Sequence, residues 1–134
     1  MLEWKGGQVE TRVVGASRAA IDETLIACVV SAKIHAPVVT SVYHGSIQMR
    51  PAKKEGDGFS GYWGSFAVNY ALVIELGSKP HIIKAAPGSA LFWNGADHPV
   101  KKVNHPGTRA QHILTNAALQ EYPKLISRIK GKLK

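Results

Sequence analysis

Two histidines flank a Pro-Gly pair near the C-terminal end of the chain, in the stretch VNHPGTRAQHILTNAAL at residues 103–119. An imidazole can bind a metal ion, act as a general base, or exchange hydrogen bonds with a neighbouring molecule. These roles belong to different kinds of protein. The other reactive groups along the chain therefore decide which role the sequence favours.

The spacing of the histidines argues against a metal site. A helical zinc pair needs two histidines about one turn apart on one face, with a third ligand nearby. His105 and His112 are seven positions apart with Pro106-Gly107 between them, and no His-Glu-X-X-His motif occurs. Cys28 is the single cysteine, so a cysteine zinc site is excluded. We expect no metal and no other cofactor. The histidines are His35, His44, His81, His98, His105 and His112.

Other catalytic arrangements are equally poorly supported. No Gly-X-Ser-X-Gly elbow and no glycine-rich phosphate motif is present. The carboxylates of Glu55 and Asp57 lie in a glycine-rich segment, and Cys28 lies on an apolar helix face, where a thiol usually acts as a small hydrophobic group. We expect no catalytic residue, and a small hydrolase that uses histidine is the third alternative.

The charge balance points to an acidic partner. Seventeen Lys and Arg oppose nine Asp and Glu, which gives a formal net charge of +8. Lys53-Lys54 forms one basic cluster, and no helix-turn-helix, zinc finger or aromatic RNA-binding motif accompanies it. A nonspecific nucleic-acid-binding module is therefore one interpretation, and docking to an acidic protein is another. The basic C-terminal end, residues 123–134, carries Lys124, Arg128, Lys130, Lys132 and Lys134.

The His-Pro-Gly stretch fits a docking loop. A Pro-Gly turn fixes the direction of the chain at low entropy cost, and the neighbouring polar side chains offer hydrogen bonds. We expect this turn to contact a neighbouring subunit or to lock the sheet onto the following helix; a purely local turn is the alternative. The predicted docking residues are Asn104, His105, Pro106, Gly107 and Thr108.

The helices and strands that must position these residues begin in the first half of the chain. Residues 1–16 are predicted to be an extended arm, since Val9, Thr11 and Val13 alternate with polar residues. A helix follows, from an N-cap at Ser17 to about residue 34, and Pro37 ends it. A strand is expected over about 40–50. Residues 51–61, charged and rich in glycine, are expected to form an exposed mobile loop.

The second half contains short strands and a final helix. Residues 70–76 fit a helical turn or a strand, and strands are expected at 81–86, 90–93 and 99–103, with a Pro87-Gly88 turn between the first two. The last helix is expected from about Arg109, and Pro123 should kink it or start a new helix.

Together these elements predict one α+β domain of 134 residues. It would contain an N-terminal helix, a small antiparallel sheet with a long exposed hairpin loop, and a long C-terminal helix packed on the sheet. No apolar run is long enough to span a bilayer, no signal peptide is visible at the start, and the lone cysteine suits a reducing compartment.

Three stretches resemble one family. They are AKIHAPVVTSVYHGSI at 32–47, NYALVIELGSKPH at 69–81 and VNHPGTRAQHILTNAAL at 103–119. Their order and spacing, over about residues 18–130, resemble the small neck proteins of long-tailed phages, the tail completion or head–tail joining proteins. The chain departs from the family pattern at Val39 and Ser41, where aspartate and glycine are frequent, and at Gln111-His112, where proline-phenylalanine is frequent. The motif residues are Pro37, Thr40, Ser46, Tyr70, Glu75 and Gly77.

The resemblance implies a non-enzymatic structural protein of the virion, made in the bacterial cytoplasm. Six copies would form a ring in the neck, between neighbouring head-completion and tail terminator or tube proteins, with no membrane involved. Double-stranded DNA would pass through the ring without sequence-specific contacts. The His-Pro-Gly turn and the C-terminal cations would dock to subunits or partners, and Lys53 and Lys54 would line the channel or contact a neighbour.

Overall fold

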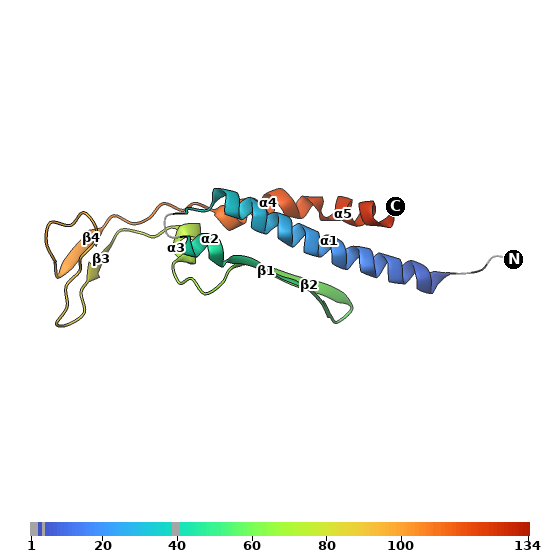
Figure 1. Ribbon diagram of the computed structural model, residues 1–134, viewed down its shortest axis with the longest axis horizontal. Helices are drawn as coiled ribbons and strands as arrows, with labels where there is room; N and C mark the ends of the chain where they lie inside the picture. The colour runs from blue at the N-terminus through green and yellow to red at the C-terminus, as the bar shows by residue number, and fades with distance from the viewer. Residues whose placement is uncertain (1–2, 4, 39–40) are drawn as a thin grey trace. The chain divides into compact units, whose positions relative to one another are not determined.

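The computed structural model describes residues 3, 5–38 and 41–134, and it has the expected α+β class (Figure 1). The chain divides into two compact units. Unit 1 contains the chain up to Ala71 together with His112–Lys134, and unit 2 is Leu72–Gln111. Each unit has a two-stranded antiparallel sheet of its own. The structure therefore contains two separate small sheets in place of the single sheet that was predicted.

Helix α1, Gly6–His35, is the longest element of unit 1. The prediction of an extended arm up to residue 16 is therefore wrong from Gly6 onward. The alternation of Val9, Thr11 and Val13 does not produce a strand, and Thr11 Oγ1 donates to the Gly7 carbonyl oxygen at 2.9 Å within the helix. Ala36, in an extended conformation before Pro37, ends the helix as expected.

A β-hairpin follows the short helix α2, Val42–Ser46. It pairs β1, Ile47–Glu55, with β2, Gly58–Ser65. The predicted strand over 40–50 is thus a helical turn in its middle part. The predicted loop over 51–61 is wrong, because β1 and β2 pair across most of it and the chain reverses in a tight turn at Gly56-Asp57. Gly56 has a φ of +59°, which suits such a turn.

A bulge fits this hairpin onto α1. The register shifts between Arg50 and Lys53, and Pro51, which has no N–H to donate, lies in the shift. Ala52 is fully buried, and its backbone N–H donates to Asp22 Oδ1 of α1 at 2.6 Å. A Cβ at Gly61 would lie 2.5 Å from Leu25 Cδ1, so the absence of a side chain there lets β2 approach α1.

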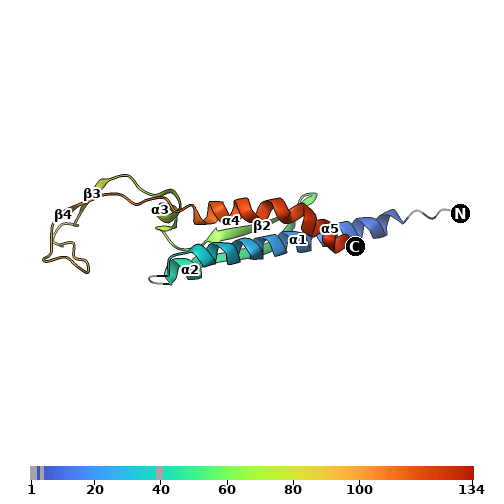
Figure 2. The ribbon, with the colours of Figure 1, turned by 90° about the horizontal axis from the view of Figure 1, so that it is seen from above.

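The C-terminal helices pack along the same α1 (Figure 2). They are α4, Ile113–Glu121, the 3-10 turn η1, Tyr122–Lys124, and α5, Leu125–Leu133. Pro123 lies in η1 and a new helix begins after it, as predicted. The helix starts at residue 113 rather than 109, because His112 has a φ of +51° and the Gln111 N–H donates instead to the Ile74 carbonyl oxygen.

Unit 2 contains α3, Ala71–Leu76, whose first residue belongs to unit 1, and the ladder of β3, His81–Lys84, with β4, Lys102–His105. The turn at Pro87-Gly88 is present, with Ser89 N–H donating to the Ala86 carbonyl oxygen. The expected strand at 90–93 is only a single bridge between Leu91 and Val100, since β3 pairs with β4 and leaves the segment between them as a loop. Within the described residues, no helix is long and apolar enough to cross a membrane.

Candidate functional site

Two segments of unit 2 run side by side at Ser78 and Thr108. The Ser78 N–H donates to the Thr108 carbonyl oxygen at 2.9 Å, and the Thr108 N–H donates to the Ser78 carbonyl oxygen at 3.0 Å. The Thr108 N–H also lies 3.1 Å from Ser78 Oγ. This Ser78–Thr108 crossing brings together Gly77 and Gly107, which the sequence separates by thirty positions.

Both glycines are required by the close approach of the two backbones. Gly77 has a φ of +72° and Gly107 a φ of +89°, a region that disfavours residues with a Cβ. A Cβ at Gly77 would lie 2.5 Å from the Thr108 carbonyl oxygen, and one at Gly107 would collide with the Ser78 carbonyl oxygen. The Pro-Gly pair after His105 is therefore part of a tertiary contact, in addition to a local turn.

The histidine before that pair fixes the turn. His105 Nδ1 accepts a hydrogen bond from the Gly107 N–H at 3.0 Å. Its ring centroid lies 5.0 Å from that of His81, the residue that faces it across the β3–β4 ladder. Among the described residues, no group of three or more His, Cys, Asp or Glu is placed to hold a metal ion. His112, the other histidine of the opening motif, belongs to unit 1.

An apolar pocket of about 560 Å³ lies within unit 2. Three of the predicted docking residues, Asn104, His105 and Pro106, form part of its wall. Gly107 and Thr108 lie outside it and belong to the Ser78–Thr108 crossing. We call this pocket the unit 2 pocket, and its remaining lining is Ile83, Leu91, Phe92, Trp93 and Val103.

Sequence reasoning missed the aromatic part of this pocket. Phe92 and Trp93 are 67% and 46% exposed, although they are among the largest apolar side chains of the chain. They had been assigned to a strand, where such residues would normally be covered. The turn sequences on either side, which contain Gly88 and Gly95, were the signal in the sequence that this short segment lies on a loop. In the structure these two glycines have φ values of +79° and +98°.

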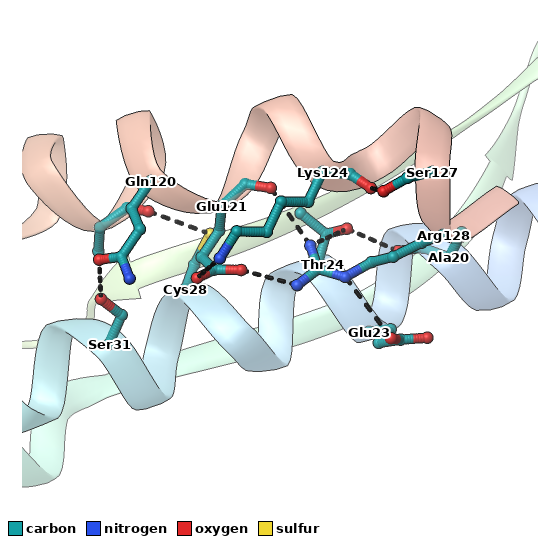
Figure 3. A network of polar contacts seen from close by, with 11 residues as sticks. Ala20, Glu23, Thr24, Cys28, Ser31, Gln120, Glu121, Lys124, Ser127 and Arg128 are labelled. Atoms are coloured by element: carbon teal, nitrogen blue, oxygen red, sulfur yellow. Dashed lines mark hydrogen bonds and ion pairs between the residues drawn. The ribbon is translucent and has the colours of Figure 1, made fainter. Parts of the chain in front are cut away.

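A polar network ties the C-terminal helices to α1 (Figure 3). Glu121 is buried and accepts from Lys124 Nζ and from Arg128 Nη2, each at 2.7 Å. Arg128 Nη1 also donates to Thr24 Oγ1 at 3.1 Å and to the Glu121 carbonyl oxygen at 3.2 Å. On the surface side, Glu23 pairs with Arg128 at 3.5 Å and with Lys132 at 2.6 Å.

These partners shift the titration of the two carboxylates. The hydrogen bond from Lys124, followed by that from Arg128, lowers the pKa of Glu121. The hydrogen bond from Lys132 lowers the pKa of Glu23. Nearby, burial raises the pKa of Cys28 to about 11, and its thiol points at the Ala117 carbonyl oxygen of α4. Both carboxylates are therefore held in their charged form by the cations of η1 and α5.

This network bears on the predicted docking role of the basic C-terminal end. Lys124, Arg128 and Lys132 pair with Glu121 and Glu23 within unit 1, and the Arg128 side chain is only 15% exposed. Within the described residues, Lys130 and Lys134 have no ion pair and stay available to a partner.

The second basic cluster lies on a strand. Lys53 and Lys54 are exposed on β1, opposite Ser60 and Phe59 of β2. They line a shallow surface groove of about 370 Å³ together with Arg50, whose guanidinium lies 4.7 Å from the Phe66 ring centroid. The predicted mobile loop is therefore a structured basic strand, and its cations have defined positions.

The family-motif residues have structural positions. Pro37 follows α1, and Ser46 Oγ donates to the Tyr43 carbonyl oxygen at 2.7 Å and lies 2.6 Å from Ser65 Oγ. Glu75 is buried in α3, Tyr70 is exposed before it, and Gly77 lies at the Ser78–Thr108 crossing. Thr40 lies outside the described residues.

The comparisons with known proteins add no assignment. No protein-family model, no curated protein and no solved structure matches the chain.

Proposed function

We propose that this chain is a structural, non-enzymatic subunit of the neck of a long-tailed phage, where six copies form a ring at the head–tail junction through which DNA passes. The three sequence blocks that resemble neck proteins support the proposal. The fold adds to it, because the second and third blocks meet at the Ser78–Thr108 crossing and contribute Gly77 and Gly107 to one close contact.

The observation that carries the proposal is the lack of an apolar core in unit 2. Residues 72–111 are all described, and Glu75 is the buried residue among them; every buried apolar side chain of the described chain lies in unit 1. So little buried apolar area gives a segment of this size little stability of its own. Unit 2 therefore suits a subunit that a neighbouring molecule completes.

The exposed groups of the chain match the partners expected in a neck. The unit 2 pocket offers apolar cover for a neighbouring subunit or for a head-completion or tail terminator protein, and Lys130 and Lys134 suit an acidic surface. Lys53 and Lys54 are exposed on β1, where they suit the passing DNA or a neighbouring subunit. The same strand also supports the second candidate, a nonspecific nucleic-acid-binding module, because Arg50, Lys53 and Lys54 gather along one groove.

Complementation of a phage that lacks this protein tests the proposal. Particles without the protein should appear in electron micrographs as full heads and separate, unattached tails, and the wild-type chain should restore joined particles. Trp93→Ala, in the unit 2 pocket, should fail to restore them. Ile82→Ala is the matched control, because Ile82 is 57% exposed on β3 and does not line the unit 2 pocket.

Two results would contradict the proposal. If heads and tails join in the absence of the protein, the protein is not required at the head–tail junction and the proposed role is wrong. Joined particles together with a purified protein that shifts any DNA at moderate salt, and loses this property when Arg50, Lys53 and Lys54 are changed to glutamine, would favour the nucleic-acid-binding module instead.

A further inference from the structure

The β3–β4 ladder of unit 2 has two free edges. It pairs His81–Lys84 with Lys102–His105, and among the described residues no third strand pairs with either of them. The backbone N–H and C=O groups along a free edge can accept a further extended segment, which adds to the sheet as a new strand. The ladder therefore has the geometry to bind a strand from another molecule.

The ladder presents apolar and basic side chains in alternation. Successive side chains of a strand point to opposite faces of the sheet. The cross-strand pair of Ile83 and Val103 is half-buried and lines the unit 2 pocket. The next pair, Lys84 and Lys102, is exposed. A strand added to this ladder would therefore place alternate side chains towards an apolar surface and towards lysines.

The unit 2 pocket lies mainly along β4. Four consecutive residues, 103–106, line it, whereas β3 contributes Ile83. The wall also includes the exposed aromatic side chains of Phe92 and Trp93. Binding at a sheet edge takes its affinity from main-chain hydrogen bonds and its specificity from pockets that receive alternate side chains. The β4 edge has such a pocket beside it.

The lysines of this ladder have no acidic partner. Unit 2 contains five Lys and Arg side chains and two carboxylates, of which Glu75 is buried and Asp97 is exposed on the loop between the strands. In the described part of the chain, none of the ion pairs includes Lys84, Lys101 or Lys102. Like charges that face each other across a ladder repel. A carboxylate near the Lys84–Lys102 pair would therefore stabilise it.

This charge distinguishes between the candidate occupants of the edge. A second copy that paired through the same ladder would bring its own lysines against Lys102. The other strands of a second copy fit no better, because Glu55 at the end of β1 is the single carboxylate that β1 and β2 carry. A nucleic acid would neutralise the lysines but could not continue the alternating N–H and C=O pairing of a strand.

We propose that the β4 edge binds an extended segment of a partner protein in which apolar and acidic residues alternate. The backbone of the segment pairs with β4, its apolar side chains enter the unit 2 pocket, and its carboxylates meet Lys102, with Lys84 on the next strand. The inference rests on the proposed function for the presence of a neighbouring protein. It names the chemistry by which that neighbour is recognised.

Binding of designed peptides to the purified protein tests the proposal. The probe is a fluorescent peptide of about eight residues in which valine and glutamate alternate, and binding is followed by fluorescence anisotropy. It should bind more tightly than a peptide of the same composition with its valines and glutamates in two blocks. It should also bind more tightly than an alternating threonine–glutamate peptide, which cannot fill the apolar pocket. Hydrogen exchange at the amides of β4 should slow when the peptide binds.

Charge reversal supplies the matched variants. Lys84→Glu together with Lys102→Glu keeps a like-charge pair across the ladder, so the circular dichroism spectrum should be that of wild type. This variant should bind the valine–glutamate peptide on the order of tenfold more weakly and should prefer an alternating valine–lysine peptide. Lys79→Glu together with Arg109→Glu changes the net charge equally outside both strands, and it should alter binding by less than about twofold.

Three results would overturn the proposal. They are no binding of the valine–glutamate peptide at its highest soluble concentration, equal binding by the Lys84 and Lys102 variant, and slowed hydrogen exchange elsewhere but not in β4. Binding of an oligothymidylate that requires these two lysines, without binding of the peptide, would assign them to nucleic acid instead. Separate heads and tails in the absence of the protein, combined with no peptide binding, would keep the proposed function and reject this partner chemistry.

Discussion

Arg128 Nη2 lies 2.7 Å from Glu121 Oε2, a contact that joins α5 to α4 across the 3-10 turn containing Pro123. The proline interrupts the helix, and this ion pair, with the Arg128 bond to the Glu121 carbonyl oxygen, holds the two halves in a fixed relation. Arg128 also reaches Thr24 of α1, so the same side chain fixes the position of the C-terminal helices on the long helix.

Loss of this arginine should destabilise unit 1. Arg128→Gln removes the hydrogen bonds to Glu121 and Thr24 and leaves a buried carboxylate with Lys124 as its remaining cation. We expect a loss of about 1.5–3 kcal/mol in the free energy of unfolding, the usual value of hydrogen bonds to charged groups. Lys130→Gln, on the same helix but outside the network, should change it by less than about 0.5 kcal/mol. Urea unfolding followed by circular dichroism measures both.

Acid should weaken the same contacts. The pKa values of Glu121 and Glu23 are lowered in the folded state, so their contribution to stability is complete above the unfolded value of about 4.3 and is lost as the pH falls through the lower folded values. The urea midpoint of wild-type protein should therefore drop below about pH 4.3. Glu121→Gln should be less stable at neutral pH and show a shallower drop. An equally steep drop in Glu121→Gln would show that this carboxylate does not contribute.

The sequence indicated α1 from Ser17 onward, the break at Pro123 and the segregation of helices and strands, because these follow from local periodicity and proline chemistry. The sequence did not predict the β1–β2 hairpin, because Lys53, Lys54 and the neighbouring glycines are typical of a loop. The contacts of Ala52 and Gly61 with α1, which hold the hairpin, are tertiary. The sequence singled out the turn at residues 104–108 but not the pocket, which three of these residues line in the structure together with Phe92 and Trp93. It could not reveal that Glu23 and Glu121 neutralise the C-terminal cations, because those pairs depend on tertiary packing.

Alanine substitutions at two glycines can separate the cost of a positive φ from the cost of a steric collision. Gly88 and Gly107 both have positive φ, at +79° and +89°, but a Cβ at Gly88 would meet no other atom within 4 Å, whereas one at Gly107 would collide with the Ser78 carbonyl oxygen. Gly88→Ala should cost only the strain of that conformation, about 1–2 kcal/mol. Gly107→Ala should in addition open the Ser78–Thr108 crossing. Hydrogen exchange at the Ser78 and Thr108 amides should be accelerated in Gly107→Ala alone, and equal acceleration in both variants would contradict the close contact.

The lone thiol should be unreactive while unit 1 is folded. Cys28 is fully buried, and burial raises its pKa to about 11, so very little thiolate exists near neutral pH. Against an ordinary thiol with a pKa of about 8.5, the thiolate fraction at pH 8 is lower by on the order of 100-fold. Folded protein should react with a disulfide reagent at least that much more slowly than protein in urea. Rapid reaction of folded protein would show that α4 separates readily from α1.

The C-terminal cations divide into two groups that should behave differently. Lys124, Arg128 and Lys132 form ion pairs with Glu121 and Glu23, so their replacement by glutamine should lower the unfolding midpoint at neutral pH. Lys130 and Lys134 are exposed and lie outside that network, so the same replacement there should leave the midpoint unchanged.

If the chain acts in the neck as proposed, the double variant of Lys130 and Lys134 should reduce head–tail joining in complemented phage, because two exposed charges proposed to meet an acidic partner are lost while the fold is kept. Raising the ionic strength should reduce joining by wild-type protein in the same direction, since exposed charges are screened at high salt. If the double variant joins heads to tails normally and its only defect is weaker binding to DNA in vitro, these two lysines contact nucleic acid and not an acidic protein. A fall in the unfolding midpoint of the double variant would instead show that Lys130 or Lys134 stabilises unit 1, and the division between the two groups would be wrong.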